Sequence, residues 1–305
     1  MPIIQYQEMN FTPDRAAKIE TANSIISEYH RQGYTLTLRQ LYYQFVARGL
    51  IENTERSYKN LGSIVSDGRV AGLIDWNAIE DRGRNVSTVY VQEDEQEVLN
   101  GLEYQLALDF WRDQDAYVEV WVEKEALAAV IERPASRWHV PYMACKGYLS
   151  ASEAWRAGRR FRRKALEGVS RLAVIHLGDH DPSGIDMSRD NQARLDLFGE
   201  DSGVELHRIA LNMDQVEAYN PPPNPAKVTD SRAQDYIRRF GHTSWELDAL
   251  EPRVLDKLIG DKVQEFIDHD KWQATEDQQD EQRQLLSRLH ANWAEVREFV
   301  EGLAE

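Results

Sequence analysis

RLAVIHLGDHDPSGIDM, at residues 171–187, is the stretch of sequence that decides the fold. Its first seven residues are mostly apolar, as is typical of a buried strand. Asp179 and Asp181 follow directly, and Pro182 fits the first turn of a helix. The stretch therefore predicts a strand that carries two aspartates at its carboxyl end and leads into a helix.

Similar strand-like runs occur on both sides of this stretch. They are YVEVWV at 117–122, VPYMA at 140–144 and VELHRIA at 204–210. Helical stretches lie between the strands, at about 125–133, 150–166 and 183–197. This alternation predicts an α/β fold with a doubly wound parallel sheet, which the proline-rich segment NPPPNPAK at 220–227 ends.

The N-terminal part has a helical pattern instead. A helix is expected over 13–31, where Thr12 is a suitable N-cap and Pro13 fits the first turn. A second helix is expected over 38–49, and a third amphipathic stretch runs from about Tyr58 to Leu73. Three short helices followed by an irregular segment fit a winged-helix module. The predicted domains are a winged-helix DNA-binding module at 1–90, an acidic linker at 91–116, the sheet domain at 117–220 and a helical C-terminal extension at 221–305.

Charge is unevenly distributed along the 305 residues. The net charge of −16 at first argues against nucleic acid as a partner. However, residues 91–116 and 261–305 each carry a net charge of −7, so the acidity is segmental. The run RAGRRFRRK at 156–164 holds six bases and no acid. It predicts a DNA-binding surface, with a solvated helix face as the alternative; the arginines concerned are Arg159, Arg160, Arg162 and Arg163.

Composition also bears on the compartment. The sequence holds no run of about 18 apolar residues, so no transmembrane helix is expected. The N-terminal residues lack the pattern of a secretory signal. The single cysteine, Cys145, excludes an internal disulfide and a cysteine-built zinc site. These features predict a cytoplasmic protein, associated with the nucleoid if it binds DNA.

Acidic residues follow two strands of the predicted sheet. Glu123 comes directly after YVEVWV, and Asp179 and Asp181 come after RLAVIHL. Ligands bind outside the carboxyl ends of the strands in open α/β sheets, so these side chains can converge on one hard cation. An all-oxygen site suits Mg²⁺, with Mn²⁺ able to substitute, and stabilises charge on a phosphoryl group. The alternative is that the aspartates cap the helix at Pro182 while Glu123 pairs with Lys124 at the surface.

Two adjacent tyrosines lie on the second predicted helix. Tyr42 shares an apolar stripe with Leu41 and Phe45, so it should be buried. Tyr43 lies about 100° further round, on the face of Arg39, and should be more exposed. An exposed tyrosine beside an arginine is suited to attack a phosphate that the guanidinium holds. The alternative is that Tyr43 packs against a neighbouring domain or stacks on a base.

Together these motifs resemble those of the topoisomerase VI A subunit and the related meiotic double-strand-break transesterases. LTLRQLYYQF at 36–45 is similar to the catalytic-helix motif of that family, and VWVEKEAL at 120–127 to its first Toprim motif. ACKGYLS at 144–150 resembles its lysine-glycine-tyrosine stretch, which implies that Lys146 contacts DNA. LGDHDPSGIDM at 177–187 is similar to its Asp-x-Asp-Pro-x-Gly motif. The order of the motifs is also that of the family.

The resemblance implies a winged-helix module followed by a Toprim domain, and type IIB-like cleavage of double-stranded DNA. Tyr43 is then the covalent nucleophile and Arg39 positions the phosphate. Glu123, with Asp179 and Asp181, holds Mg²⁺ and moves a proton at the leaving sugar oxygen. The family also implies a homodimer, in which Tyr43 of one subunit faces the acids of the other.

The chain departs from the family pattern in ways that leave other functions open. Leu149 and Ser150 stand where the family has proline and aspartate, and no P-loop is present, so strand passage needs a separate ATPase partner. A compact, stand-alone relative fits best. The alternatives are a Toprim nuclease that uses water as nucleophile and a non-catalytic DNA-binding protein with a Toprim fold. In SWELDALEP at 244–252, Glu246 and Asp248 either add a metal- or phosphate-positioning acid or cap and solvate a helix.

Overall fold

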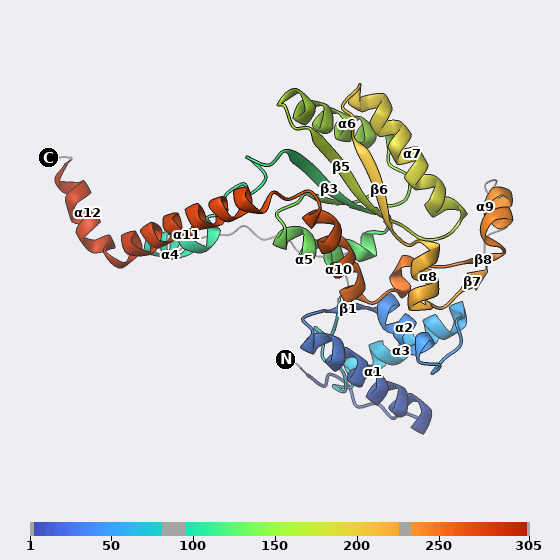
Figure 1. Cartoon of the computed structure of the whole chain (residues 1–305). Helices are drawn as coiled ribbons and strands as arrows, with labels where there is room; N and C mark the ends of the chain where they lie inside the picture. Colours follow the sequence, from blue (N-terminus) through green and yellow to red (C-terminus); the bar gives the residue numbers. More distant parts are fainter. Residues whose placement is uncertain (1–2, 81–94, 226–232, 304–305) are drawn as a thin grey trace.

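A four-stranded parallel sheet forms the centre of the protein (Figure 1). The structure, a computed structural model, describes residues 3–80, 95–225 and 233–303. The strands, in the order β4-β3-β5-β6 across the sheet, are β3 (Ala116–Val122), β4 (Tyr142–Ala144), β5 (Arg171–Leu177) and β6 (Glu205–Ala210). All neighbouring pairs are parallel. The four strands match those that the sequence predicts, so the expected α/β class is confirmed.

Helices connect the strands, as parallel pairing requires. The connections are η1 (Glu125–Leu127) with α5 (Ala128–Arg137), then α6 (Ala151–Leu166), then α7 (Pro182–Gly199). Helices α6 and α7 cover one face of the sheet, while α5 and α10 (Pro252–Gln264) cover the other (Figure 1). The sheet is therefore buried on both faces, and the carboxyl ends of its strands lie along one edge, where ligands commonly bind in open α/β sheets.

Side chains of the central strands alternate between the two cores. Val118, Val120 and Val122 of β3 belong to the apolar cluster with α5 and α10, whereas Trp121 belongs to the cluster with α6 and α7. Strand residues alternate faces, so a strand that is covered on both faces is apolar at nearly every position. Glu119 is an exception to this apolar pattern. Its buried carboxylate is tolerated because Tyr117, Trp121 and Arg160 donate hydrogen bonds to it.

Helix α10 completes the core from far along the chain. Leu255, Ile259 and Val263 of this helix are buried in the same cluster as the sheet residues. Before it come α8 (Met213–Tyr219), α9 (Ala233–Phe240), η2 (Leu247–Ala249) and the short antiparallel pair β7 (Asn224–Pro225) and β8 (Thr243–Ser244). Residues expected in a separate C-terminal extension thus pack under the sheet, while the division into domains stays a prediction. Residues 226–227 of the proline-rich segment lie outside the described residues.

Three helices make up the N-terminal part, and they share one apolar core. They are α1 (Pro13–Arg31), α2 (Leu38–Ala47) and α3 (Glu55–Val70). Thr12 caps α1, and Thr37 caps α2 in a reciprocal arrangement with Gln40, as the capping preferences of threonine predict. A short parallel pair, β1 (Leu36–Thr37) with β2 (Ile79–Glu80), lies beside them. Helices α1 and α2 thus begin where the sequence predicts, whereas α3 begins three residues before the expected stretch.

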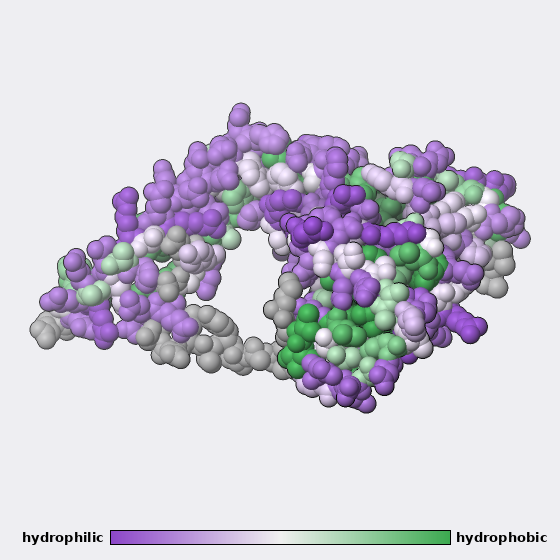
Figure 2. Space-filling model, turned by 90° about the horizontal axis from the view of Figure 1, so that it is seen from below, coloured by the Kyte–Doolittle hydropathy of each residue, from purple (hydrophilic) through white to green (hydrophobic). Residues whose placement is uncertain are grey.

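A helical arm extends away from the body (Figure 1). It consists of α4 (Glu95–Gln105), α11 (His269–Ala291) and α12 (Trp293–Gly302). Gln279 and Arg283 of α11 bind the backbone next to α4, at Leu108 N (2.9 Å) and Leu106 O (2.9 Å). Figure 2 shows that the arm surface is predominantly hydrophilic. Residues 91–94 of the expected acidic linker lie outside the described residues, and no described helix is long and apolar enough to cross a membrane.

Candidate functional site

The carboxyl ends of β3 and β5 bring the predicted acids together. Glu123 follows β3, and its Oε2 accepts a hydrogen bond from the backbone N–H of Asp179 (2.9 Å), which lies just after β5. The backbone N–H of Glu123 donates in turn to the carbonyl of Leu177 (2.9 Å). Asp181 stands two residues further on, at the start of α7. The expected convergence of these three residues at one edge of the sheet is therefore present.

Two glycines permit this close approach. A Cβ atom at Gly184 would lie 2.2 Å from the carbonyl oxygen of Asp179, and one at Gly178 would lie 2.9 Å from Oε2 of Glu123. Arg208 of β6 stabilises the segment between β5 and α7, since its guanidinium donates hydrogen bonds to the carbonyls of Gly184 (3.0 Å) and Asp179 (2.6 Å). The glycines of the GDHDPSG motif thus serve close packing around the acids.

The two aspartates have different local roles. Asp181 is the N-cap of α7, since its Oδ1 accepts hydrogen bonds from Gly184 N (2.6 Å) and Ser183 Oγ (2.9 Å). The capping alternative is therefore correct for Asp181. Asp179 is buried, and its Oδ1 accepts from the backbone N–H of Leu247 (2.8 Å). Asp179 therefore links the end of β5 to the segment that precedes α10.

Lys124, Glu246 and Asp248 belong to the same cluster. The ammonium of Lys124 lies 2.8 Å from Asp179, 3.0 Å from Glu246 and 3.5 Å from Asp248. Arg39 reaches the cluster from α2, at 2.7 Å from Glu246 and 3.9 Å from Asp248. The expectation that Lys124 pairs with Glu123 at the surface is wrong, since its partners are these other acids. The expectation that Asp248 is exposed to solvent is also wrong, because its side chain is buried. The available signal was three acids alternating with apolar residues in the segment SWELDALEP.

The expected exposure of Tyr43 is wrong. Only 4% of its surface is exposed, the same fraction as for Tyr42. Helix α2 is covered on a second side by η2 and the β7–β8 region, which helical periodicity within α2 does not reveal. Glu246 and Asn224 lie near enough to the Tyr43 hydroxyl to influence its pKa. Tyr42 points elsewhere, and its hydroxyl donates to Asn53 Oδ1 (2.9 Å).

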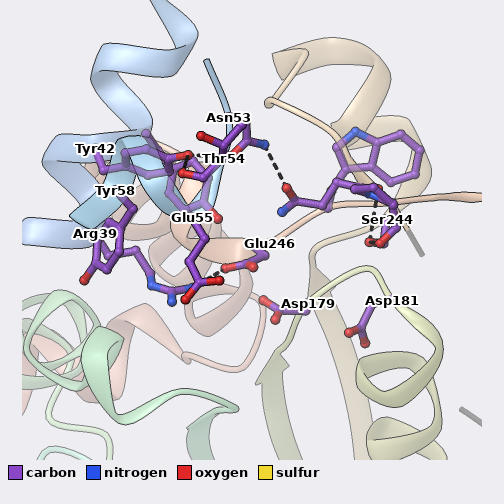
Figure 3. A pocket seen from close by; sticks show the side chains of 14 residues that line it. Arg39, Tyr42, Asn53, Thr54, Glu55, Tyr58, Asp179, Asp181, Ser244 and Glu246 are labelled. Carbon is purple, nitrogen blue, oxygen red and sulfur yellow. Dashed lines mark hydrogen bonds and ion pairs between the residues drawn. The ribbon is translucent and has the colours of Figure 1, made fainter. Parts of the chain in front are cut away.

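A pocket of about 660 Å³ separates the helical module from the acidic edge (Figure 3). Arg39 and Tyr43 line it from α2, and Asp179 and Asp181 line it from the sheet domain. Figure 3 shows Glu246 between these two sides, in contact with Arg39. The pocket thus brings a phenol, a guanidinium and carboxylates together within a single chain.

Burial dominates the ionisation of the acids. It raises the pKa of Asp179 to about 7 and also raises the pKa of Glu123, although basic groups oppose both shifts. Burial would raise the pKa of Glu246 too, but Lys124 and Arg39 outweigh it and lower that pKa. Burial and the neighbouring Glu246 raise the pKa of Tyr43, so its hydroxyl keeps its proton at neutral pH. The ionised form of these carboxylates is therefore stabilised mainly by the neighbouring basic side chains, Lys124 and Arg39 among them.

A second, smaller pocket adjoins the cluster. It has a volume of about 320 Å³, and Arg39, Lys124, Lys146 and Asp248 are among its lining residues. Lys146 has a left-handed backbone (φ 58°), and its ammonium pairs with Glu125 (2.7 Å). Lys146 therefore lines the same pocket as Glu123 and Asp248, and its expected contact with DNA stays a prediction.

The basic run lies on α6 and lines neither of these pockets. Arg160 binds the buried Glu119 through Nε (2.9 Å) and Nη2 (3.0 Å). The other predicted arginines pair with surface acids: Arg159 and Arg162 with Glu200, and Arg163 with Glu167. The structure therefore does not bring these arginines to the acidic cluster, and their contact with DNA stays a prediction.

The ligand atoms of the cluster are of the type that a hard cation prefers, but their positions do not form a metal-binding site. Its carboxylates supply only oxygen ligands, which Mg²⁺ and Mn²⁺ prefer. Oδ1 of Asp248 is buried without a hydrogen-bond partner. Within 3–80, 95–225 and 233–303, however, no group of three or more acidic, histidine or cysteine side chains is positioned to hold a metal ion. The ammonium of Lys124 lies among the carboxylates instead.

Comparison of the sequence with protein-family models and with curated proteins found no match. The functional argument therefore depends on the site itself.

Proposed function

We propose that this protein is a magnesium-dependent DNA-cleaving enzyme similar to the topoisomerase VI A subunit, with a winged-helix module and a Toprim domain. One observation carries the proposal. Tyr43 and Arg39 line the same pocket as Asp179 and Asp181, although their segments are far apart in sequence. A phenol that shares a pocket with acids at the carboxyl edge of a parallel sheet is suited to attack on a phosphodiester.

The proposed reaction is a transesterification. The Tyr43 oxygen attacks phosphorus, a phosphotyrosine bond forms, and the bond to one sugar oxygen breaks. Glu246, the carboxylate whose charge raises the pKa of the Tyr43 hydroxyl, takes its proton. Arg39 holds a phosphate oxygen, and Glu123 governs the proton at the leaving sugar oxygen. Glu123, Asp179 and Asp181 would hold a divalent cation, which would supply charge stabilisation to the phosphoryl group.

The same proposal includes double-stranded DNA as substrate, a homodimer and a separate ATPase partner for strand passage. In one chain Tyr43 already lines a pocket with its own Asp179 and Asp181, so a dimer is not needed for that contact. A homodimer instead places two such sites on the two strands of a duplex. The cytoplasm, on the nucleoid, is the proposed location.

A second function, a nuclease that uses water as nucleophile, is favoured by the burial of Tyr43. A phenol with a raised pKa is a weak nucleophile until it loses its proton. In this alternative Tyr43 packs beside Glu246 and Arg39, and a water molecule in the pocket attacks the phosphorus.

Plasmid cleavage distinguishes the two functions. Supercoiled plasmid is incubated with the protein and Mg²⁺, Mn²⁺ or EDTA, then denatured with and without protease. The proposal expects cation-dependent cutting and DNA that stays with protein until protease is added. Cut DNA with no attached protein supports the nuclease. No cutting under any of these conditions contradicts both enzymes and supports a non-catalytic DNA-binding protein.

A further inference from the structure

Lys124 is held as a metal ion would be held. An ammonium has three N–H donors, and those of Lys124 are surrounded by the carboxylates of Asp179, Glu246 and Asp248. These acids come from two segments, the end of β5 and the start of η2, so the contact is long-range. Only 22% of the Lys124 side chain is exposed. The ammonium therefore occupies the centre of the acidic cluster.

The cluster nevertheless holds more acidic than basic side chains. Among the described residues, the acids are Glu123, Asp179, Asp181, Glu246 and Asp248, and the bases that act on them are Arg39, Lys124 and Arg208. A divalent cation stabilises the ionised form of such carboxylates more strongly than one monovalent ammonium does.

One carboxylate oxygen of Asp248 is buried without a partner among the described residues. Asp248 is 3% exposed, this oxygen is Oδ1, and Oδ2 faces Lys124 and Arg39. Buried polar atoms in native proteins are nearly always paired, because an unpaired one costs about 1–3 kcal/mol. A cation that binds both Asp248 and Glu246 satisfies this oxygen.

The second pocket has room for the Lys124 side chain in another rotamer. Lys124 lines this pocket, of about 320 Å³, together with Lys146 and Gly147. A lysine side chain has four rotatable bonds, so its ammonium can leave the acids without movement of the backbone. Once there, it lies beside Lys146 and Arg39, where a phosphodiester can neutralise all three.

We propose that Lys124 holds the place of a divalent cation in the resting site, and that the cation binds Asp179, Glu246 and Asp248 by displacing its ammonium into the second pocket. The inference rests on the proposed function in that it makes this cluster the cation site. It goes beyond that function by adding Glu246 and Asp248 as ligands and by giving Lys124 a regulatory role.

Direct cation binding by the full chain, without DNA, tests the exchange. Lys124→Met removes the competing charge and keeps a chain of similar length. Mn²⁺ binding, measured by electron paramagnetic resonance, and Mg²⁺ binding, measured by calorimetry, should both tighten about tenfold or more. Lys262→Met is the control, because Lys262 pairs with Glu265 and lines neither pocket, and its Mn²⁺ affinity should be unchanged. Equal or weaker Mn²⁺ binding by Lys124→Met overturns the proposal.

The wild-type protein provides a second measurement that does not depend on whether the variant folds. Lysine acylation is followed residue by residue by mass spectrometry, with and without Mn²⁺. Lys124 should react slowly without the cation and faster with it, while Lys262, which pairs with Glu265 on α10, should not change. A Lys124 that stays protected while Mn²⁺ is bound overturns the exchange.

The two proposals fail separately. Lys124 release on Mn²⁺ binding with no DNA cutting refutes the proposed enzyme and leaves the exchange intact. Cation-dependent DNA cutting with an immobile Lys124 refutes the exchange and leaves the enzyme intact. Asp248→Asn adds a direct check of the ligand set, since loss of one carboxylate should weaken Mn²⁺ binding about tenfold or more. Unchanged Mn²⁺ affinity in Asp248→Asn removes Asp248 from the site.

Discussion

The carboxyl edge of the sheet and helix α6 are both densely charged, but their charges are assembled differently. At the edge, Arg39, Lys124, Asp179 and Asp248 come from distant segments and meet in a largely buried cluster. On α6, six bases follow one another within nine residues, and surface acids pair with most of them. A run of like charge in a sequence is therefore a weaker sign of a site than single charges that the fold collects.

Burial explains the difference in energy between the two regions. Exposed ion pairs such as Arg163–Glu167 contribute about 0–1 kcal/mol, because water and salt screen them. A buried charge that loses its partner costs several kcal/mol, because water cannot replace that partner. Substitutions at the edge should therefore lower catalytic activity strongly, whereas substitutions on α6 should change activity and stability little. Arg160 is the exception in stability, because it pairs with the buried Glu119.

The largest effect is expected from Asp179→Asn. The amide keeps an oxygen that accepts the N–H of Leu247 but removes a charge from the cluster. DNA cleavage should fall by about 10³-fold or more, since a cation site loses a carboxylate. Asp196→Asn, an exposed aspartate of α7, is the control and should cleave normally. Normal cleavage by Asp179→Asn contradicts the assignment of the acidic edge.

The tyrosine pair gives the next contrast. Tyr42→Phe removes a buried hydroxyl that is hydrogen-bonded to Asn53, so it should lower stability by about 1 kcal/mol, and Tyr43→Phe should lower it by no more than that. Only Tyr43→Phe should abolish the covalent protein–DNA adduct, because Tyr43 is the proposed nucleophile. Thermal melting and denaturing gels measure both effects. If Tyr43→Phe still nicks DNA at full rate without an adduct, the nuclease is the better account.

Arg160 should behave as a structural residue rather than as a DNA contact. Arg160→Met leaves the buried Glu119 with Tyr117 and Trp121 as its remaining donors, so stability should fall by about 2 kcal/mol. Arg159→Met, from an exposed pair on the same helix, should change stability by less than about 0.5 kcal/mol. Chemical denaturation measures both. Equal losses in the two variants would show that burial does not distinguish them.

The smallest effect is expected from the exposed arginines of α6. Arg159, Arg162 and Arg163 changed together to Gln should weaken DNA binding by about tenfold and reduce its salt dependence, without preference for sequence. Fluorescence anisotropy at several salt concentrations measures this. An unchanged affinity removes the basic run from the DNA-binding surface and sharpens the contrast with the edge.

The strands and most helices were predictable because their signals are local. A strand covered on both faces is apolar throughout, as in β3 and β5, and Thr12 and Thr37 mark helix starts by capping. Glu123, Asp179 and Asp181 were predictable as a group, because parallel strands end at one edge.

The remaining features depend on contacts that no local pattern reports. Tyr43 is buried because η2 and the β7–β8 pair cover a second side of α2. Helix α10 packs under the sheet from more than 40 residues after β6. The roles of Lys124 and Asp248 arise from the same long-range contact. Periodicity within one helix cannot show which distant segment will pack on it.

Mass spectrometry of the cleaved complex tests the central claim most directly. Wild-type protein is incubated with duplex DNA and Mn²⁺, denatured, and digested with nuclease and trypsin. The proposal predicts a nucleotide attached through phosphate to Tyr43, in the peptide that follows Arg39, and its absence when EDTA replaces Mn²⁺. Cut DNA together with an unmodified Tyr43 peptide, or a nucleotide on any other residue, would contradict it.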